Sequence, residues 1–351
     1  MNILHIFKNT NEKFYNPFIS FINANFNYND HYFMIEKYTD KNKDTKFADN
    51  VELVNKRNYF RIVKRLYTSD KIILHSLMSP RLMFLLFFQP WLLKKCYWVI
   101  WGADLYYHNY RHRNIKSNIN ENMRKKIIKN VRGVITHVKS DYELAKKWYG
   151  TKGEYYYSSL YPSNLYQKFP YNNEMINSNK TYIQIGNSAD PSNNHFEVLD
   201  KLQKYNDLDI ELICPLSYGN REYASQVIEY GKKFFGDKFI PVTEFQPFDE
   251  YRNLLAKIDV AIFNHNRQQA LGNIITLLGL GKKVYLRKEI TTWQFCIDHD
   301  LKIYSANDEL GDIFIHMSMS DKRNNINKIT TQFSEKKLMQ DWNTIFEGDI
   351  R

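Results

Sequence analysis

The feature that most constrains this chain is a regular alternation of short apolar runs with longer segments able to form helices, clearest after residue 180. Each run has the length and the Val, Ile and Phe content of a buried strand. The predicted strands span 181–185, 210–214, 239–242, 260–264, 283–286 and 302–304. The predicted helices begin near Asp190, Arg221, Phe248, Gly272 and Thr292. This alternation predicts a parallel, doubly wound α/β sheet.

The first half of the chain repeats the alternation less regularly. Its predicted strands span 2–7, 32–36, 71–76, 97–101 and 133–137. A capping box that starts at Ser140 predicts a helix running to Tyr149, which Gly150 ends. A polar stretch at 171–180 separates the halves. The predicted domains are 1–170, a linker over 171–180, 181–320, and a C-terminal helix over 321–351 that returns to the first domain.

Length and composition agree with two globular domains. The chain has 351 residues, of which 43% are hydrophobic and 25% charged. Cys96, Cys214 and Cys296 lie far apart without CxxC spacing, so neither a zinc site nor a disulfide framework is indicated. The first residues form a short apolar stretch followed by a basic residue, the reverse order of a secretory signal. We expect a reducing, cytoplasmic environment.

The charge of the chain is uneven. Residues 1–170 hold 28 Lys and Arg against 13 Asp and Glu, a balance of +15, whereas the remainder holds 21 against 25, a balance of −4. A solvated basic surface, nucleic acid and an anionic membrane would each explain the excess. Although the chain has 26 tyrosines, no RNP-like or helix-turn-helix signature accompanies them, so we expect no nucleic-acid partner.

The stretch at 81–95, RLMFLLFFQPWLLKK, favours a membrane. It is apolar, interrupted by Gln89 and Pro90, and shorter than the ~20 residues that span a bilayer. Arg81, Lys94 and Lys95 flank it, so it suits the membrane interface, with its cations near lipid headgroups. A buried helix of an α/β domain explains the stretch equally well.

Two Rossmann-like, doubly wound domains facing each other across a cleft are the architecture of GT-B glycosyltransferases. Dehydrogenases and periplasmic-type binding proteins share parts of it, and the fold alone does not choose among them. The chain contains neither GxGxxG nor GxxxxGK[ST], which argues against a dinucleotide fingerprint and a P-loop.

Two loops of the second half suit a nucleotide sugar. Gly186, Asn187 and Ser188 follow a predicted strand, and the loop suits either contact with a sugar or outer phosphate, or a structural turn. The region 263–286 is the better phosphate site, because a helix without an acid in its first turn favours an anion. Its candidate donor-binding residues are Arg267, as a forked cation for a diphosphate, Gln268, Gly272, Asn273, and Thr276 for a ribose hydroxyl.

Four segments carry a family resemblance: WVIWGADLY at 98–106, IGNSADPSNNH at 185–195, PLSYGNREY at 215–223 and NRQQALGN at 266–273. With Trp293, they resemble the 4-acetamido-4,6-dideoxygalactose (Fuc4NAc) transferases of enterobacterial common antigen synthesis, in register from about 97 to 305. The resemblance implies a GT-B enzyme at the cytoplasmic face of the inner membrane. It further implies a TDP-sugar donor and an undecaprenyl-diphosphate-linked acceptor.

The chain departs from the pattern of that family near the expected donor loops. The departures are Ala189, Pro191, Ala270 and Asn273. They leave the donor sugar open more than the reaction class.

Against this background Asp104 is a candidate catalytic base for the acceptor hydroxyl, because an acid buried behind Trp98 and Trp101 has a raised pKa. The alternative is that Asp104 caps a turn or pairs with Arg111 or Arg113. His5, in the first predicted strand, is a weaker candidate.

Nucleobase contact and metal binding are harder to assign. Tyr218 and Phe245 follow strands of the second domain and are candidates for stacking on the base. The DxD sequence Asp298-His299-Asp300 follows a predicted helix rather than a strand. We therefore expect neither a metal nor any other cofactor, with cationic and amide groups neutralising the leaving diphosphate.

Three hypotheses follow: a sugar transferase acting on a lipid-linked saccharide, another nucleotide-sugar enzyme of the same fold such as an epimerase, and a non-catalytic membrane-surface binding module. The first is favoured because the anion site and the basic, apolar patch lie in opposite halves. The acceptor's terminal sugar, the stereochemical outcome and the oligomeric state stay open.

Overall fold

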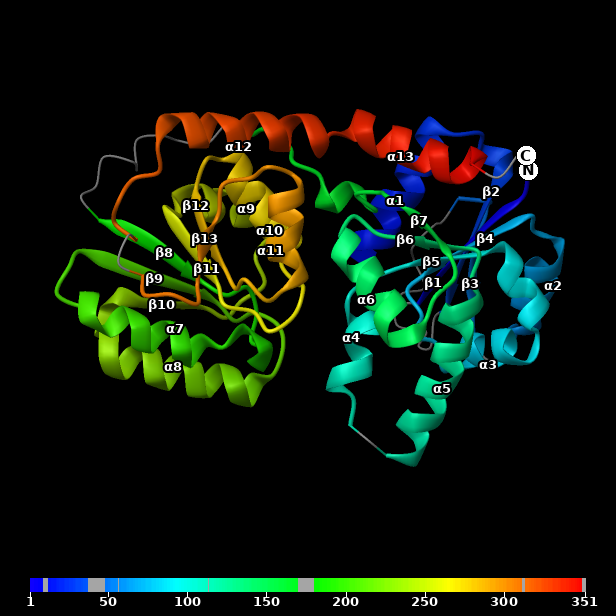
Figure 1. Cartoon of the computed structure of the whole chain (residues 1–351), viewed down its shortest axis with the longest axis horizontal. Helices are drawn as coiled ribbons and strands as arrows, with labels where there is room; N and C mark the ends of the chain where they lie inside the picture. The colour runs from blue at the N-terminus through cyan, green and yellow to red at the C-terminus, as the bar shows by residue number, and fades with distance from the viewer. Residues whose placement is uncertain are drawn as a thin grey trace. The chain divides into compact units, whose positions relative to one another are not determined.

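The protein forms two compact α/β units in a computed structural model that describes residues 1–8, 12–36, 48–55, 57–112, 114–169, 180–310 and 313–348. Unit 1 comprises Met1–Asn164 and Glu335–Arg351, and unit 2 comprises Leu165–Ser334 (Figure 1). The predicted linker over 171–180 lies, apart from Lys180, outside the described residues.

Unit 1 is built on a parallel sheet with the strand order β3-β2-β1-β4-β5-β6-β7. Among the described residues its strands are β1 Ile3–Lys8, β2 His31–Glu36, β3 Val51–Val54, β4 Lys71–His75, β5 Cys96–Val99, β6 Gly133–Ile135 and β7 Glu154–Tyr156. After β3 the chain crosses back and places β4 on the other side of β1. β1 thus lies between β2 and β4, and both are parallel to it, as in a Rossmann fold.

Helices cover both faces of this sheet (Figure 1). They are α1 Glu12–Asn25, α2 Phe60–Thr68, α3 Pro80–Phe88, α4 Ala103–Tyr110, α5 Ile115–Asn130, α6 Lys139–Tyr149 and α13 Glu335–Glu347, with short 3₁₀ turns η1 Tyr28–Asp30, η2 Pro90–Lys95 and η3 Pro162–Asn164. α2 to α6 enclose an aliphatic core on one face. On the other face, α1 and α13 pack aromatic rings against the sheet, including Phe18 and Trp342.

Unit 2 repeats the design with the order β10-β9-β8-β11-β12-β13, the Rossmann order counted from its own first strand. Its described strands are β8 Thr181–Ile185, β9 Ile210–Pro215, β10 Phe239–Val242, β11 Val260–Phe263, β12 Lys283–Leu286 and β13 Tyr304–Ser305. Its helices are α7 His195–Leu202, α8 Arg221–Phe235, α9 Phe248–Lys257, α10 Leu271–Gly279, α11 Thr291–Asp298 and α12 Met319–Gln332, with 3₁₀ turns η5 Pro191–Asn193, η6 Gln203–Tyr205 and η7 Gly236–Lys238. α7 and α8 lie on one face of the sheet, and α9, α10 and α11 on the other (Figure 1).

The predicted doubly wound sheets are confirmed, and all eleven predicted strands are present within one or two residues of their expected bounds. β3 and β7 were not predicted. The capping box at Ser140 is wrong: α6 begins at Lys139 after Val138, which makes no side-chain cap. Gly150 ends that helix in the left-handed conformation, as expected.

Two other predicted helices differ in the structure. Asp190 caps only the 3₁₀ turn η5, and α7 begins at His195, because Asn194 adopts a left-handed conformation between them. The segment 321–351 contains two helices rather than one. α12 ends at Gln332 within unit 2, whereas α13 packs in unit 1.

The stretch at 81–95 folds as α3 followed by η2, and one side of it is buried in the α/β domain, as the second alternative expects. Its contact with a membrane stays a prediction. Leucine and methionine side chains are buried in the core of unit 1: Leu82, Met83, Leu86, Leu92 and Leu93. Aromatic side chains of the same stretch face outward. In the part of the chain that the structure describes, no helix has the length and apolar character to cross a membrane.

Candidate functional site

The strand order of unit 2 places its most favourable ligand site beside β8 and β11. In open parallel sheets, ligands bind outside the carboxyl ends of the strands, where the strand order reverses. In unit 2 that position lies between the loop after β8, residues 186–194, and the loop after β11, residues 264–270. The loop after β9 joins them through a bridge between Ala189 and Gly219. Most of the predicted donor-binding residues lie on these loops.

The loop after β8 turns tightly at Gly186, whose φ of 64° is in the left-handed region. A Cβ at this position would lie 2.7 Å from both Asn193 Oδ1 and His195 Nε2. Asn193 Oδ1 accepts a hydrogen bond from Asn187 N at 3.0 Å, and Asn193 Nδ2 donates to Ser188 Oγ at 3.3 Å. Glycine is therefore required here so that the loop can close on its own side chains, rather than only to admit a ligand.

An ion pair ties the two loops together. Arg267 Nη2 lies 3.0 Å from Asp190 Oδ2, and both side chains are partly exposed. Burial alone would raise the pKa of Asp190, but hydrogen bonds from Ser192 and the charge of Arg267 lower it overall. Asp190 is thus ionised at neutral pH and holds the guanidinium at the switch point. Sequence reasoning did not predict this ion pair.

Two buried histidines lie under the same loops. His265 Nε2 lies 3.0 Å from Asn193 Oδ1, and burial, together with the charge of Arg267, lowers the pKa of His265 to about 3. Burial likewise lowers the pKa of His195 to about 4, and its Nδ1 lies 3.1 Å from Tyr223 Oη. Both imidazoles are neutral at pH 7. Sequence reasoning missed both histidines, although His265 lies closer to the end of its strand, β11, than Arg267 does.

The side-chain atoms at this edge that are buried without a hydrogen-bond partner among the described residues include Asn187 Oδ1, His195 Nε2, Asn264 Oδ1 and His265 Nδ1. His195 Nε2 packs against Gly186. Because Asn193 Oδ1 accepts from His265 Nε2, His265 Nδ1 is an acceptor, as is Asn187 Oδ1. Buried acceptors without a partner are rare in native proteins, and each calls for an explanation such as a catalytic role or a bound water or ion.

The remaining donor-binding candidates have more varied surroundings. Tyr218 Oη accepts a hydrogen bond from Asn187 Nδ2 at 2.7 Å, which brings this aromatic ring to the site. Phe245, after β10, is 81% exposed. Asn273 Nδ2 donates to Tyr251 Oη at 2.8 Å, and Thr276 Oγ1 donates to the backbone oxygen of Gly272 at 2.9 Å.

α10 begins at Leu271, one residue before the predicted start, after Ala270 in a left-handed conformation with φ of 59°. Ala270 makes no side-chain cap, and the first turn, which includes Gly272, contains no acid. The amide groups of this turn are therefore available to an anion. Gln268, in the loop before the helix, accepts a weak hydrogen bond of 3.4 Å on its backbone oxygen from Arg267 Nη1.

In unit 1, Asp104 is fully buried and accepts four hydrogen bonds. The backbone N–H of Leu77 and the indole of Trp98 donate to Oδ2 at 2.9 and 2.7 Å. The N–H groups of Trp101 and Leu105 donate to Oδ1, each at 3.0 Å. Burial raises the pKa of Asp104, although these hydrogen bonds oppose the shift. The carboxylate thus fixes the loops after β4 and β5, and its role as a base stays a prediction.

Asp104 does not pair with Arg111 in the structure. Arg111 Nη1 instead lies 3.9 Å from Glu121 Oε1 and also donates to the backbone oxygen of His108. Arg113 lies outside the described residues.

His5 is the centre of a buried hydrogen-bond chain. Its Nε2 lies 3.1 Å from His31 Nδ1, and its Nδ1 lies 3.1 Å from His75 Nε2. His75 Nδ1 lies 2.7 Å from Tyr161 Oη, which also accepts from Trp101 Nε1 at 2.6 Å. Burial lowers the pKa of all three histidines, that of His31 to about 4. His5 therefore sits in a neutral polar network, and nothing in its surroundings distinguishes a catalytic from a structural role.

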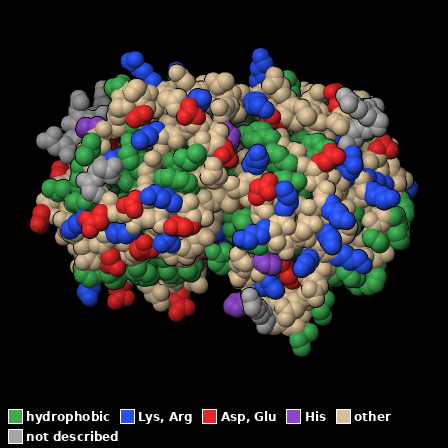
Figure 2. Space-filling view, viewed as in Figure 1, with side chains coloured by type: hydrophobic (Ala, Val, Ile, Leu, Met, Phe, Trp, Pro, Cys, Tyr) green, Lys and Arg blue, Asp and Glu red, His purple; other side chains and the backbone are tan. Residues whose placement is uncertain are grey.

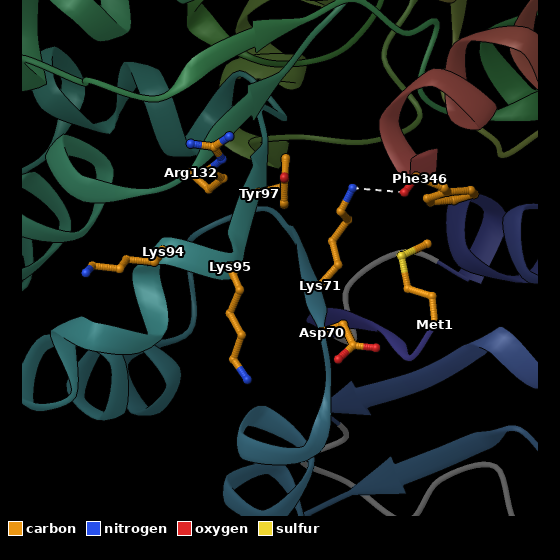
Figure 3. A pocket seen from close by; sticks show the side chains of 8 residues that line it. All are labelled: Met1, Asp70, Lys71, Lys94, Lys95, Tyr97, Arg132 and Phe346. Atoms are coloured by element: carbon orange, nitrogen blue, oxygen red, sulfur yellow. Dashed lines mark hydrogen bonds between the residues drawn. The ribbon is translucent and has the colours of Figure 1, made fainter. Parts of the chain in front are cut away.

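A pocket of about 300 Å³ lies where the strands of the unit 1 sheet have their amino ends, and it is rich in cations (Figure 3). Its cations do not converge. Lys71 Nζ donates to the backbone oxygens of Ile345 and Phe346 at the end of α13, at 2.6 and 3.0 Å. Lys95 Nζ donates to the backbone oxygens of Tyr67 and Ser69, and Figure 3 shows Lys95 and Arg132 pointing away from each other. Lys71 and Lys95 therefore hold the ends of helices rather than form an anion site.

The two aspartates of the DxD sequence make separate contacts. Asp298 ends α11 and accepts from Gln294, whereas Asp300 pairs with Lys328 at 3.3 Å. Across the described residues, no group of three or more His, Cys, Asp or Glu side chains is placed to hold a metal ion.

Solved structures with this fold include glycosyltransferases. HepE of Anabaena, crystallised with UDP, matches with a TM-score of 0.74 and 12% identity, over 99% of this chain and 100% of that chain. WaaG, a glycosyltransferase involved in lipopolysaccharide biosynthesis, matches with a TM-score of 0.67 and 11% identity, over 99% and 100%. Sucrose-phosphate synthase from Thermosynechococcus elongatus matches with a TM-score of 0.68 and 10% identity, over 99% of each chain.

These similarities confirm the predicted fold class, which is GT-B. A family model described as 4-alpha-L-fucosyltransferase, glycosyl transferase group 56, matches residues 3–349. The chain belongs to this family, as the resemblance of its motifs indicates, and it is therefore a hexosyltransferase. Membership of this family gives no support to the other two hypotheses, another nucleotide-sugar enzyme of the same fold and a non-catalytic membrane-surface binding module.

Proposed function

We propose that the protein transfers a 4-acetamido-4,6-dideoxyhexose, such as Fuc4NAc, from a TDP-sugar to an undecaprenyl-diphosphate-linked saccharide. The reaction would serve surface polysaccharide synthesis, of enterobacterial common antigen or O-antigen, at the cytoplasmic face of the inner membrane. The observation that carries the proposal is the polar loop cluster at the switch point of unit 2, in a chain of a sugar transferase family. HepE, with the same fold, was crystallised with UDP.

In this proposal the donor's diphosphate lies at the amino end of α10. The uncapped amide groups of Leu271 and Gly272 donate to it, and Arg267 adds a cation from the preceding loop. When the acceptor oxygen bonds to the anomeric carbon, the bond from that carbon to the diphosphate breaks. The amides and the guanidinium then stabilise the charge that develops on the leaving TDP. The acceptor hydroxyl gives up a proton, for which Asp104 remains the candidate base.

The buried acceptors beside this position suit a polar sugar. Asn187 Oδ1 and His265 Nδ1 accept hydrogen bonds, and a 4-acetamido sugar offers an amide N–H and ring hydroxyls as donors. Tyr218 lies next to Asn187 and provides an aromatic surface for the thymine base. These contacts support a nucleotide-linked amino sugar over a simple phosphate ester.

The first test is a thermal-shift panel with TDP, UDP, GDP and CMP. A ligand that binds only the folded protein stabilises it by about 2.7 kcal/mol when its concentration is 100 times Kd. We expect a selective rise in Tm with TDP. Equal shifts with UDP and TDP would contradict the proposed base specificity, and no shift with any nucleotide would contradict the donor site.

A pair of arginine variants tests the site itself. Arg267→Ala is expected to abolish the TDP shift and transfer, because it removes the cation beside the diphosphate. Arg287→Ala is the matched control. Arg287 pairs with Glu197 at 3.1 Å and is 24% exposed, against 3.0 Å and 23% for Arg267 with Asp190. If both variants lose the TDP shift equally, a general loss of loop structure would replace the proposed role of Arg267.

Transfer is then measured with a TDP-linked 4-acetamido-4,6-dideoxyhexose and a lipid-linked saccharide acceptor. We expect a new glycosidic product and one TDP released per sugar transferred. Conversion of the donor sugar without acceptor would instead indicate an epimerase.

A further inference from the structure

α3 has two apolar faces, of which only one is covered. Ser79 caps the helix and Pro80 occupies its first turn, so that its start is fixed. Leu82 and Leu86, four residues apart, are buried in the core. Phe84 and Phe88 are also four residues apart, yet they are 55% and 59% exposed, with ring centroids 4.7 Å from each other. A helix that is apolar on all sides is normally buried on all sides.

Neighbouring elements extend the exposed aromatic surface. Trp91 in η2 is 55% exposed, and Phe60 and Tyr67, seven residues apart on one side of α2, are 69% and 51% exposed. Lys95 at the end of η2 donates to the backbone oxygens of Tyr67 and Ser69, so η2 and the end of α2 are adjacent. We call this surface the aromatic face and define it by Phe60, Tyr67, Phe84, Phe88 and Trp91. Figure 2 shows hydrophobic side chains over α2 and α3 at the right-hand margin.

The aromatic face is large for a surface with no partner. Its five side chains would each bury roughly 150–250 Å² and are more than half exposed, so they present on the order of 500 Å². The largest apolar patch of a typical monomer is about 300–600 Å² and is often functional. The aromatic face therefore has the size of a binding surface.

The charge around the aromatic face indicates an anionic partner. Residues 57–95, which include α2, α3 and η2, contain eight Lys and Arg but only one acid, Asp70. Asp70 accepts a hydrogen bond from the backbone N–H of Asn2 at 2.8 Å. Lys and Arg side chains surround the hydrophobic ones in this part of Figure 2. Lys126 Nζ, on α5, lies 4.5 Å from the ring centroid of Phe87 on α3.

Anionic phospholipid is the partner that combines these two properties. Phe and Trp side chains enter the boundary between headgroups and acyl chains, whereas Lys and Arg extend their charged ends to lipid phosphates. Each cation near such a surface contributes about 1 kcal/mol, and these contributions fall with added salt. A protein partner with an acidic, apolar surface is the competing occupant, and a second copy of this chain would set two basic surfaces against each other.

We propose that the aromatic face docks on the surface of an anionic bilayer, with Phe84, Phe88 and Trp91 as its anchors. The proposal names the surface for the membrane association that the proposed function expects, but its contacts do not depend on the donor site. The cations at the rim, Lys94 among them, add the preference for anionic lipid. Lys71 and Lys95 are excluded from that role because they hold the ends of helices, and Arg61 is excluded because it pairs with Glu52 at 2.6 Å.

Vesicle flotation of the full chain tests the proposal. We expect binding to phosphatidylcholine vesicles containing phosphatidylglycerol, at least tenfold weaker binding to phosphatidylcholine alone, and release as salt rises. The triple variant Phe84→Ser, Phe88→Ser, Trp91→Ser is expected to lose binding by at least tenfold. A double variant of exposed residues in unit 2, Ile315→Ser with Met319→Ser, is the control and is expected to bind normally.

Other outcomes would overturn the assignment. Ile115 and Ile119 on α5 are 82% and 55% exposed, and loss of binding only on their replacement by serine would move the docking surface. Unchanged vesicle binding with a changed oligomeric state in the triple variant would make the face a protein interface. Circular dichroism and the TDP shift, both expected to stay normal, show whether the variant is folded. Vesicle binding without any nucleotide binding would reject the proposed function and leave the docking surface standing.

Discussion

Two buried polar clusters, one in each unit, differ in how completely they are hydrogen-bonded. In unit 1, Asp104 accepts four donors, and His5 has a partner on each ring nitrogen. In unit 2, Asn187 Oδ1 and His265 Nδ1 are buried without a partner among the described residues. A complete network stabilises loops, whereas an incomplete one is costly unless a ligand completes it. This difference is why we place the donor site in unit 2, and why we expect the network of unit 1 to stabilise its loops whether or not Asp104 also acts as the base.

Acid is expected to have the largest effect, because the buried histidines of both units must stay neutral. The pKa is about 4 for His31 and His195, about 3 for His265, and lower than usual for His5 and His75. Unfolded histidine has a pKa of about 6.5, so below that pH the unfolded chain binds more protons. The free energy of unfolding is expected to fall between pH 6.5 and 4, by about 1.4 kcal/mol per pH unit for each neutral histidine.

Urea denaturation at several pH values measures this slope. The two carboxylates with raised pKa, Asp104 and Asp341, act in the opposite direction, because they bind protons in the folded state first. Stability that does not change between pH 6.5 and 5 would contradict the neutral histidine network.

Asp104→Asn is expected to have the next largest effect and tests whether the network of unit 1 is structural. Each carboxylate oxygen accepts two N–H donors, so either orientation of an asparagine amide places its NH₂ group against donors. Leaving buried donors without an acceptor is expected to cost about 3–5 kcal/mol. Urea denaturation measures that loss. A variant that keeps its stability but loses transfer would instead support the role of Asp104 as the base.

Gly186→Ala tests the closed loop of unit 2 against a control with the same backbone conformation. The left-handed φ costs alanine roughly 1–2 kcal/mol at either Gly186 or Gly150, whose φ values are 64° and 65°. At Gly186 the new Cβ also meets Asn193 and His195, whereas nothing lies within 4 Å at Gly150. We expect Gly186→Ala to lose about 1–3 kcal/mol more than Gly150→Ala, and to lose the TDP shift. Equal losses would remove the argument that this loop is closed by packing.

The fold could be predicted because strands buried on both faces are continuous apolar runs. The strands that were missed lie at or near a sheet edge: β3, with Glu52 in its centre, and β7, which begins with Glu154. Edge strands carry polar residues, so their sequences resemble loops. The predicted start of α7 at Asp190 was wrong because an N-cap residue followed by a proline can also begin a 3₁₀ turn.

Residues of the candidate site could be predicted only where their place shortly after a strand in the sequence indicates a ligand site. Gly186 directly follows β8 and Arg267 lies four residues after the end of β11, and the strand order then brings their loops together. Asn193 and His265 meet across 72 residues, and His5 meets His75 across 70. Such contacts depend on strand order and register, which a sequence pattern of period two does not specify.

The smallest expected effect concerns the direction of the histidine chain, which Trp101 fixes. An indole only donates, so Tyr161 Oη accepts from Trp101, and the structure gives its proton one other neighbour, His75 Nδ1. His75 Nδ1 is then an acceptor and its Nε2 carries the proton. His75 Nε2–H then donates to His5 Nδ1, and His5 Nε2–H donates to His31 Nδ1, so all three histidines are Nε2–H tautomers.

Nitrogen-15 NMR of the imidazole rings distinguishes the tautomers. We expect Nε2–H signals for all three histidines in the wild type. Trp101→Phe removes the indole that sets the direction, and a second tautomer is then expected to appear, with a loss of only about 1 kcal/mol in stability. Nδ1–H signals in the wild type would mean that the chain runs in the opposite direction and that the proton of Tyr161 has another acceptor. The cluster around His5 would then be incomplete as well, and the contrast that places the donor site in unit 2 would lose half of its support.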